Sequence, residues 1–207
     1  MTNATDTVVY MYETDGTLYG SKNLDSDNTN AYGITTKDAK FWTTDLNDDI
    51  VYEYSSDFSL ATSSAQTGPN QHGSGITTNR DNIWVVDEAD DVVYKYDMVG
   101  TFINSFALTA ANTDPQGIGT DGTNLWIVDE ADDAVYKYDM TGTFDTSFAL
   151  TAANTDPTGI TTDGTNIWVV DEADDAVYKY DLSGTFDTSF ALTAANADPQ
   201  GITVAPR

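Results

Sequence analysis

The sequence predicts an all-β chain folded as a five-bladed β-propeller with four strands in each blade. Tryptophan recurs with a period of 42 residues, and so does a glycine; the positions are Trp42, Trp84, Trp126 and Trp168, and Gly33, Gly75, Gly117, Gly159 and Gly201. Each period also holds four short segments rich in β-branched and aromatic residues, separated by turn signals. A repeat of this length with four strands is typical of a propeller blade.

The unit 159–200 shows the expected strands most clearly. They are 159–162, Asn166–Asp171, Ala176–Asp181 and 185–192. The pair Asp163-Gly164 between the first two is a hairpin signal. The second strand is apolar on both faces, as expected between neighbouring sheets, and the fourth alternates like an edge strand. An open β-solenoid is the structural alternative, but its coils are usually shorter and lack this graded set of strands.

The two ends of the chain are expected to share one blade and so close the ring. The predicted blades are 33–74, 75–116, 117–158 and 159–200, with a closing blade made from 1–32 and 201–207. Five units of 42 residues would need three residues more than the chain's 207. The closing blade should therefore lack most of its second strand. Two hypotheses follow: water and a loop fill this gap, or a strand from another chain fills it. If residues 1–3 pair at this place, the second hypothesis is excluded.

The net charge of the chain is strongly negative. It has 34 Asp and Glu against 8 Lys and Arg, a formal charge of −26, and the acids are spread through every segment. This predicts a halophile-type acidic surface whose self-repulsion is screened by salt. Too few cations are present to bind nucleic acid or an anionic membrane surface.

Other whole-chain features set limits on chemistry and location. The chain has no cysteine, so it has no disulfide, no thiolate metal site and no cysteine nucleophile. Its start lacks a signal peptide, and no apolar stretch reaches the length of a membrane span, so we expect a soluble protein without membrane insertion. The cell surface, a virion and the cytoplasm of a salt-loving organism all stay open as locations.

The repeat motif resembles that of a known propeller family. In order, the motif is Pro157-Thr158-Gly159-Ile160, Asp163-Gly164, Ile167-Trp168-Val169-Val170-Asp171, Val177-Tyr178-Lys179-Tyr180-Asp181 and Gly184. It resembles the NHL-type propeller repeat over essentially the whole chain, although that family usually has six blades. The resemblance implies either a lyase or lactonase with a metal in the central channel, or a platform that binds protein, RNA or sugar.

Not all of these activities fit the residues present. Lyase-like members of the family use histidines around the channel, whereas this chain has one histidine, His72. The RNA-binding members present a basic face, which is absent here. Gluconolactonase-like members hold a divalent ion with Glu, Asn and Asp, but no match in this chain singles out one set.

An acidic loop follows the second strand of each full unit. By strand order, these loops share one face with the loops that lead into the next blade. The candidate binding residues on this face are Asp45, Asp48, Asp87, Asp90, Asp91, Asp129, Asp132, Asp133, Asp171, Asp174 and Asp175. Carboxylates suit hard cations such as Ca²⁺, but the loops lack the calcium-loop pattern, so we expect at most weak cation binding and otherwise simple solvation.

Several of the recurring residues favour a structural role over a functional one. The aspartate that ends each second strand, as at Asp129, is expected to accept hydrogen bonds from turn amides. The tryptophans are expected to pack between blades, together with the tyrosine pairs Tyr94/Tyr96, Tyr136/Tyr138 and Tyr178/Tyr180. Lys95, Lys137 and Lys179 lie on the opposite face of the same strands and should pair with acidic neighbours.

These observations favour a binding or structural module over an enzyme. The units 117–158 and 159–200 differ at seven positions of 42, and such near-identical blades suit repeated contacts better than one asymmetric active site. We therefore expect a propeller that mediates protein or glycan interaction, adhesion or assembly, with no catalytic residue assigned. The alternative is a metal-dependent gluconolactonase- or lyase-like enzyme with carboxylates at the channel mouth.

Overall fold

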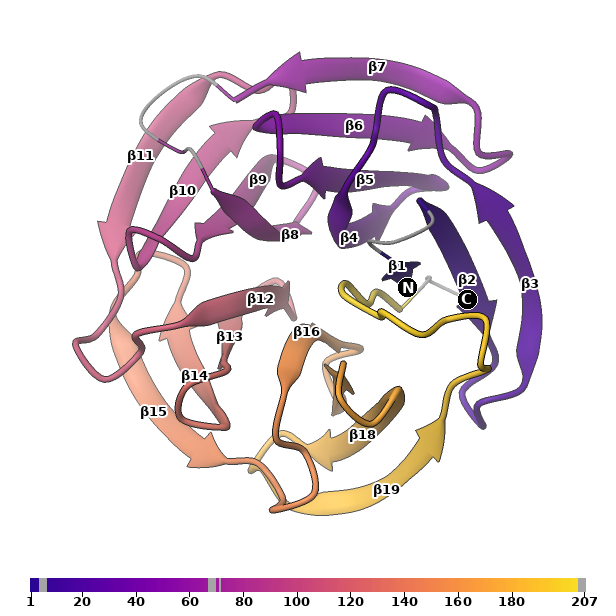
Figure 1. Ribbon diagram of the computed structural model, residues 1–207. Helices are drawn as coiled ribbons and strands as arrows, with labels where there is room; N and C mark the ends of the chain where they lie inside the picture. The colour runs from indigo at the N-terminus through magenta and orange to yellow at the C-terminus, as the bar shows by residue number, and fades with distance from the viewer. Residues whose placement is uncertain (4–6, 67–69, 71, 205–207) are drawn as a thin grey trace.

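The computed structural model describes residues 1–3, 7–66, 70 and 72–204, and all its regular elements are β-strands. Figure 1 shows five sheets arranged in a ring around a central axis. This confirms the predicted all-β, five-bladed propeller. Nothing helical among the described residues is long and apolar enough to cross a membrane.

Four sheets have four antiparallel strands each. The first contains β4 (Ala31–Lys37), β5 (Lys40–Asp45), β6 (Ile50–Ser55) and β7 (Leu60–Ala65). The second contains β8 (Gly73–Thr78), β9 (Asn82–Asp87), β10 (Val92–Asp97) and β11 (Phe102–Ala107). The third contains β12 (Pro115–Thr120), β13 (Asn124–Asp129), β14 (Ala134–Asp139) and β15 (Phe144–Ala149). The fourth contains β16 (Pro157–Thr162), β17 (Asn166–Asp171), β18 (Ala176–Asp181) and β19 (Phe186–Ala191).

The fifth sheet joins the two ends of the chain. It consists of β1 (Thr2–Asn3), β2 (Val8–Tyr12) and β3 (Leu18–Asn23). Beside β1, the amide of Thr2 donates to the carbonyl of Gly201 at 3.0 Å, and the amide of Gln200 donates to the carbonyl of Thr2 at 3.1 Å. Residues 201–204 thus take the place of the innermost strand, although they form no regular ladder. Residues 4–6 and 205–207 of the predicted closing blade lie outside the described residues.

The short second strand of the closing blade comes from this chain. Thr2 pairs with Val9 and Asn3 pairs with Val8, and the side chain of Met1 is buried against Trp168 and its neighbours. The hypothesis that a strand from another chain fills this gap was therefore wrong. A two-residue strand and one methionine replace the six-residue strand and tryptophan found in the other blades.

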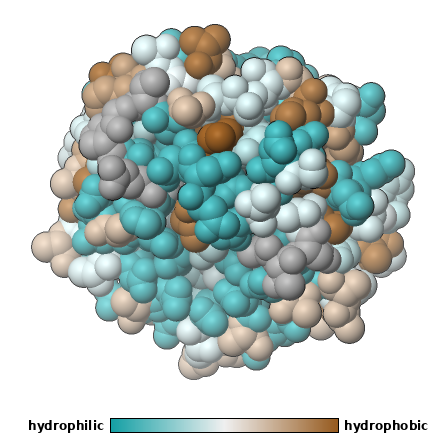
Figure 2. Space-filling view, turned by 45° about the horizontal axis from the view of Figure 1, so that its top comes forward, coloured by the Kyte–Doolittle hydropathy of each residue, from teal (hydrophilic) through white to brown (hydrophobic). Residues whose placement is uncertain are grey.

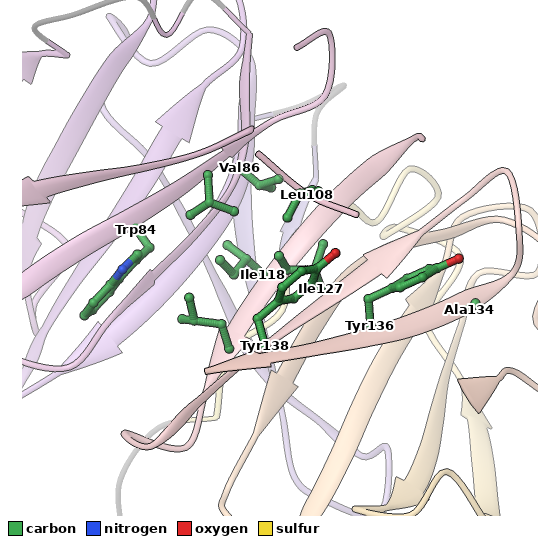
Figure 3. Close-up of a cluster of buried hydrophobic side chains, with 10 residues drawn as sticks. Trp84, Val86, Leu108, Ile118, Ile127, Ala134, Tyr136 and Tyr138 are labelled. Carbon is green, nitrogen blue, oxygen red and sulfur yellow. The ribbon is translucent and has the colours of Figure 1, made fainter. Parts of the chain in front are cut away.

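The hydrophobic core lies between the blades as five clusters. Each cluster combines side chains from two neighbouring sheets, and Figure 3 shows the one in which Trp84 and Val86 of β9 meet Ile118 of β12 and Tyr138 of β14. All four tryptophans and the three predicted tyrosine pairs are buried. Their predicted role in packing between blades is confirmed. In the cluster of Trp84, ring contacts of Tyr138 with Phe106 and Phe144 extend the packing toward the outer strands.

The innermost strands meet at a ring of glycines. A β-carbon on Gly75 would lie 2.8 Å from the Cα of Gly117, and one on Gly117 would lie 2.9 Å from the Cα of Gly159. The same relation continues to Gly201 and returns to Gly33, where the distance is 2.9 Å. The strands approach this closely only because these positions carry no side chain. The cavity left on the axis is about 10 Å³, which is about the room that one water needs.

Candidate functional site

Two layers of side chains flank the glycine ring along the axis. The residue after each glycine is isoleucine, which makes one layer apolar; the five are Ile34, Ile76, Ile118, Ile160 and Ile202. The residue before each glycine is polar and differs between blades; these are Tyr32, Ser74, Gln116, Thr158 and Gln200. The polar layer lies toward the loops that contain the candidate aspartates. Near-identical blades thus present an unequal set of side chains at this channel mouth.

Tyr32 lies at the centre of the channel mouth. Its hydroxyl donates a 2.6 Å hydrogen bond to Oε1 of Gln116, whose Nε2 donates in turn to Asp114 at 2.7 Å. Burial raises the pKa of Tyr32, and the carboxylates of Glu88, Glu172 and Glu130 raise it further. The phenol therefore remains a protonated donor within a field of negative charge.

The three glutamates whose charges act on this tyrosine come from three blades. Glu88, Glu130 and Glu172 each follow the aspartate that ends the second strand, and each is half-buried. Backbone hydrogen bonds hold them against the loop that enters the blade: the amide of Glu130 donates to the carbonyl of Asp114, and that of Glu172 to the carbonyl of Asp156, each at 3.0 Å. The diverged blade 33–74 has Leu46 at the same repeat position, so this blade contributes an apolar residue where the other three contribute a glutamate.

Gln200 at the mouth has an unused acceptor. Its Nε2 donates to Asp198 at 2.7 Å and to Glu172 at 3.0 Å, while its buried Oε1 has no hydrogen-bond partner in the part of the chain that the structure describes. In Gln116, two repeats earlier, the same oxygen accepts from Tyr32. These two glutamines have different hydrogen-bond partners, so the side chains at the mouth do not follow the symmetry of the repeat.

The crowding of carboxylates at the mouth predicts a pH effect on stability. Burial, with Asp156 and Asp114 nearby, raises the pKa of Glu130 to about 7 from an ordinary value of 4.5. A carboxyl whose pKa is raised on folding binds more protons in the native state between these two values, so stability falls as pH rises from about 4.5 to 7. At fixed salt, the melting temperature of the Glu130→Gln variant should therefore fall less between pH 5 and pH 8 than that of the wild type. An Asp145→Asn variant, which alters an exposed acid on β15, should keep the wild-type slope, and equal slopes in all three proteins would contradict the assignment.

The aspartates that end the second strands are buried and bonded to backbone. Asp129 accepts from the amides of Thr113 at 2.6 Å and Asp114 at 3.0 Å through Oδ2, and from that of Asp132 at 2.9 Å through Oδ1. The equivalent residues Asp45, Asp87 and Asp171 make the same kind of contacts, with the amide of His72 as a donor to Asp87. Their predicted role as acceptors for turn amides is confirmed. These carboxylates tie the two loops of the face together.

Four of the other candidate aspartates make hydrogen bonds within their own blades. Asp48, Asp90, Asp132 and Asp174 are exposed, and each accepts from a tyrosine hydroxyl four residues later, as Asp132 does from Tyr136 at 2.8 Å. Asp91, Asp133 and Asp175 adopt left-handed backbone conformations, with φ of 54°, 48° and 48°. Figure 2 shows hydrophilic residues spread across one side of the molecule, with hydrophobic residues only in small separate patches.

The residues at the channel mouth were not among those predicted from the sequence. Each of the three glutamates stands directly after a predicted aspartate, and Tyr32, Gln116 and Gln200 stand directly before the ring glycines. The signal that could have found them is divergence within the repeat: Thr158 and Gln200 form one of only seven differing pairs between the last two full units.

The sequence predicted at most weak cation binding on the acidic face, and ion pairs for three lysines. Within residues 1–3, 7–66, 70 and 72–204, no group of three or more His, Cys, Asp or Glu side chains is arranged to hold a metal ion. The residues described therefore do not fit a preformed metal centre.

The predicted ion pairs are present at Lys137–Asp145 and Lys179–Asp187, at 2.8 and 2.7 Å, whereas Lys95 lies over the ring of Trp84, 5.1 Å from its centroid.

Solved structures with the same fold include both enzymes and binding proteins. A streptogramin B lyase is 21% identical with a TM-score of 0.59, and the match covers 96% of this chain and 66% of that one. A catalytically inactive histidine-to-alanine variant of virginiamycin B lyase from Staphylococcus aureus, with quinupristin, is 19% identical with a TM-score of 0.62, covering 98% and 69%. A chain of a nidogen/laminin complex is 20% identical with a TM-score of 0.67, covering 98% and 82%.

These likenesses establish the fold, and the chain spans about two thirds of the length of the lyase structures. No match was found among curated proteins. A family model described as the virginiamycin B lyase family matches residues 5–207, nearly the whole sequence. The chain therefore belongs to the virginiamycin B lyase family.

Proposed function

We propose that this propeller is a binding and assembly module, not a catalyst, and that it works at high salt. Its partner, a protein or a glycan, is held on the face formed by the acidic loops and centred on the channel mouth. A place on a cell surface or a virion of a salt-loving organism is consistent with the excess of acidic residues.

One observation carries the proposal: three half-buried glutamates lie near enough to the mouth for their charges to raise the pKa of Tyr32, and none of them forms an ion pair with a lysine or arginine of the described residues. Burial raises the pKa of Glu130 and of Glu88, and nearby charges raise both further: those of Asp156 and Asp114 for Glu130, and that of Asp114 for Glu88. The carboxylates of the mouth therefore repel one another. A cationic group that entered the mouth would relieve this repulsion. The unequal ring of Tyr32, Gln116 and Gln200 would orient it through hydrogen bonds.

The charge of the face favours a protein partner that presents lysine or arginine. Complementary charge across an interface contributes more to association rate and specificity than to affinity, which suits reversible contacts made in screening salt. A glycan would instead use its hydroxyls as donors to the same carboxylates. The two classes differ in their response to salt, because only the cationic partner loses affinity steadily as salt rises.

Binding is tested with a panel of lysine- and arginine-containing peptides and a panel of neutral oligosaccharides, measured by biolayer interferometry over a salt series. The Glu130→Gln/Glu172→Gln double variant should bind a selected peptide roughly tenfold more weakly than the wild type does. The control is Asp145→Asn/Asp187→Asn, which removes the same charge from exposed residues on β15 and β19 and should leave affinity unchanged. Equal losses in both variants would show general attraction to an acidic protein and would contradict a site at the mouth.

Family membership supports a second candidate, a metal-dependent lyase- or lactonase-like enzyme with carboxylates at the mouth. In the related Staphylococcus aureus lyase, a histidine-to-alanine variant is catalytically inactive. This chain has one histidine, and His72 is exposed on the rim of the acidic face. Incubation with quinupristin and Mg²⁺, followed by chromatography, tests the candidate; turnover abolished by Glu130→Gln would replace the binding proposal with the enzymatic one.

A further inference from the structure

A phenylalanine on the outermost strand closes three of the interfaces between blades. Phe106, Phe148 and Phe190 occupy one repeat position on β11, β15 and β19. Phe106 packs with Trp84, Leu125 and Met140 of the same interface, and its ring centroid lies 6.1 Å from that of Tyr138. A β-carbon on Gly16 of the closing blade would lie 2.6 Å from the ring of Phe190, so the ring lies directly against the turn of the next blade.

The interface between the blades 33–74 and 75–116 lacks this phenylalanine. Ser64 of β7 holds the same repeat position, and a β-carbon on Gly100 in the facing turn would lie 3.0 Å from the β-carbon of this serine. A pocket of about 260 Å³ remains beside it. Its apolar wall consists of Trp42, Val51, Ile83, Met98 and Val99. The first four correspond to Trp84, Val93, Leu125 and Met140, the residues of the cluster that holds Phe106.

The surface around the pocket is apolar in this blade alone among the three most similar units. Val99, 75% exposed, replaces Thr141 and Ser183 of the later blades. Val99 lines the pocket, so its exposed side chain extends the apolar surface beyond the size of one ring. An exposed valine of this kind is costly to solubility in the absence of a partner.

The opposite wall of the pocket is polar and rigid. Glu53 accepts from Nε1 of Trp42 at 3.1 Å and from Lys40 at 2.6 Å, which fixes the indole in place. Thr62, Ser63 and Ser64 of β7 contribute hydroxyls, and β7 is the outermost strand of its sheet. Hydrogen-bonding groups therefore lie next to the apolar wall, as backbone amides beside an aromatic side chain would require.

We propose that the pocket beside Ser64 is a docking site for a phenylalanine side chain of a partner polypeptide. The chain's own interfaces supply the template, because three equivalent pockets are each filled by a phenylalanine that comes from an edge strand. An apolar cavity of about 150 Å³ is enough to bind benzene, so the volume here suffices for a phenyl ring. The exposed Val99 indicates a polypeptide, since a lone ring would leave it uncovered. The site is separate from the channel mouth and does not rest on the function proposed there.

The first test follows the indole N–H resonances of the four tryptophans by NMR during titration with N-acetylphenylalaninamide. Only the resonance of Trp42 should shift, and N-acetylalaninamide should shift none. The Ser64→Phe variant fills the pocket with the side chain found at the other interfaces, so it should fold and should bind the probe roughly tenfold more weakly or not at all. A shift that persists unchanged in Ser64→Phe, or no shift of Trp42 at all, would overturn the proposal.

A matched variant opens the same pocket elsewhere. Phe148→Ser removes the phenylalanine from the interface between the blades 117–158 and 159–200, where Trp126 holds the place of Trp42. In this variant the probe should shift the indole resonance of Trp126 in addition to that of Trp42. A folded Phe148→Ser protein in which Trp126 does not respond would contradict the claim that a missing phenylalanine creates the site.

The nature of the occupant is tested with a short peptide in which apolar residues flank the phenylalanine. The peptide should bind more tightly than the amide, and Val99→Thr, which introduces the residue found at this position in the unit 117–158, should reduce its affinity toward that of the amide. Equal affinities with no effect of Val99→Thr would overturn a polypeptide partner in favour of a small free aromatic molecule. Self-association of the wild type that Ser64→Phe abolishes, measured by sedimentation velocity, would overturn it in favour of a second copy of this chain.

Discussion

Replacing Gly117 with alanine is expected to lower the free energy of unfolding by about 3 kcal/mol, the upper part of the usual range for overpacking. The added β-carbon would lie 2.9 Å from the Cα of Gly159, 2.9 Å from the carbonyl oxygen of Thr158 and 3.0 Å from the amide nitrogen of Ile160. All three atoms belong to the backbone of β16, so no side chain can turn away to make room. Relief requires displacement of one blade from the axis, which loosens the packed clusters on both of its sides.

The measurement for Gly117→Ala is denaturant unfolding at fixed high salt, with thermal unfolding as a second probe. For a chain of this size, a loss of about 3 kcal/mol corresponds to roughly 6–12 °C in melting temperature. Gly20→Ala is the control, because a β-carbon on Gly20 of β3 would meet only the flexible end of Met11, at 3.5 Å. That variant should stay within about 1 kcal/mol of the wild type. A loss below about 1 kcal/mol for Gly117→Ala would mean that the axis of the propeller adapts easily.

Replacing Asp129 with alanine is expected to be similarly severe, at about 3 kcal/mol or more, because several buried donors lose their acceptor at once. The carboxylate is fully buried and accepts three backbone amides from two loops. Each buried donor left without an acceptor costs about 1–3 kcal/mol, and water can compensate only in part where the loops are half-exposed. Asp129→Asn, which keeps one acceptor oxygen, should lose less than the alanine variant.

The control for this series is Asp132→Ala, three residues further on in the same loop. Asp132 is exposed and its side chain accepts from the hydroxyl of Tyr136, so its removal should cost about 1 kcal/mol or less. Unfolding in guanidinium chloride at one pH ranks the variants. If Asp129→Ala and Asp132→Ala are equally stable, the buried carboxylate does not hold the two loops of the acidic face together.

Much of the fold could be predicted because each 42-residue repeat contains the pattern of strands and turns of one blade. The 42-residue period placed Trp126 between blades and Asp129 at a turn, and both positions are as expected. Strand β16 begins at Pro157, two residues before the predicted start, because its pairing with β17 includes an irregularity between Pro157 and Gly159. A period and a β-propensity locate strands, but they do not resolve where a bulge adds a residue to one side of a pair.

The channel mouth could not be predicted in the same way. Which loop side chain reaches the axis depends on the tilt of each strand and on the path of its loop, and neither is encoded in spacing alone. The aspartates selected from the sequence accept hydrogen bonds from turn amides or tyrosine hydroxyls, as Asp129 and Asp132 do, whereas the charge of the adjacent Glu130 acts on Tyr32. Comparison of positions across repeats, not the consensus within them, marks such sites: Ser64 among phenylalanines and Tyr32 among smaller polar residues are the departures that matter.

The bond between Thr2 and Gly201 has a consequence for how the protein is made. It joins residues about 200 positions apart, so the ring cannot close until synthesis has passed residue 201, although each complete sheet pairs only with sequence neighbours and can form earlier. The entropy of closing so long a loop is lost in one late step, and the cluster that joins Met1 to Trp168 and Ile202 stays incomplete until then. Residues 1–3 are therefore synthesised first, but they pair with residues 200 and 201 last. Until then the ring is open on the ribosome, and this is the species most exposed to chaperones and to pairing with the near-identical blades of another nascent chain.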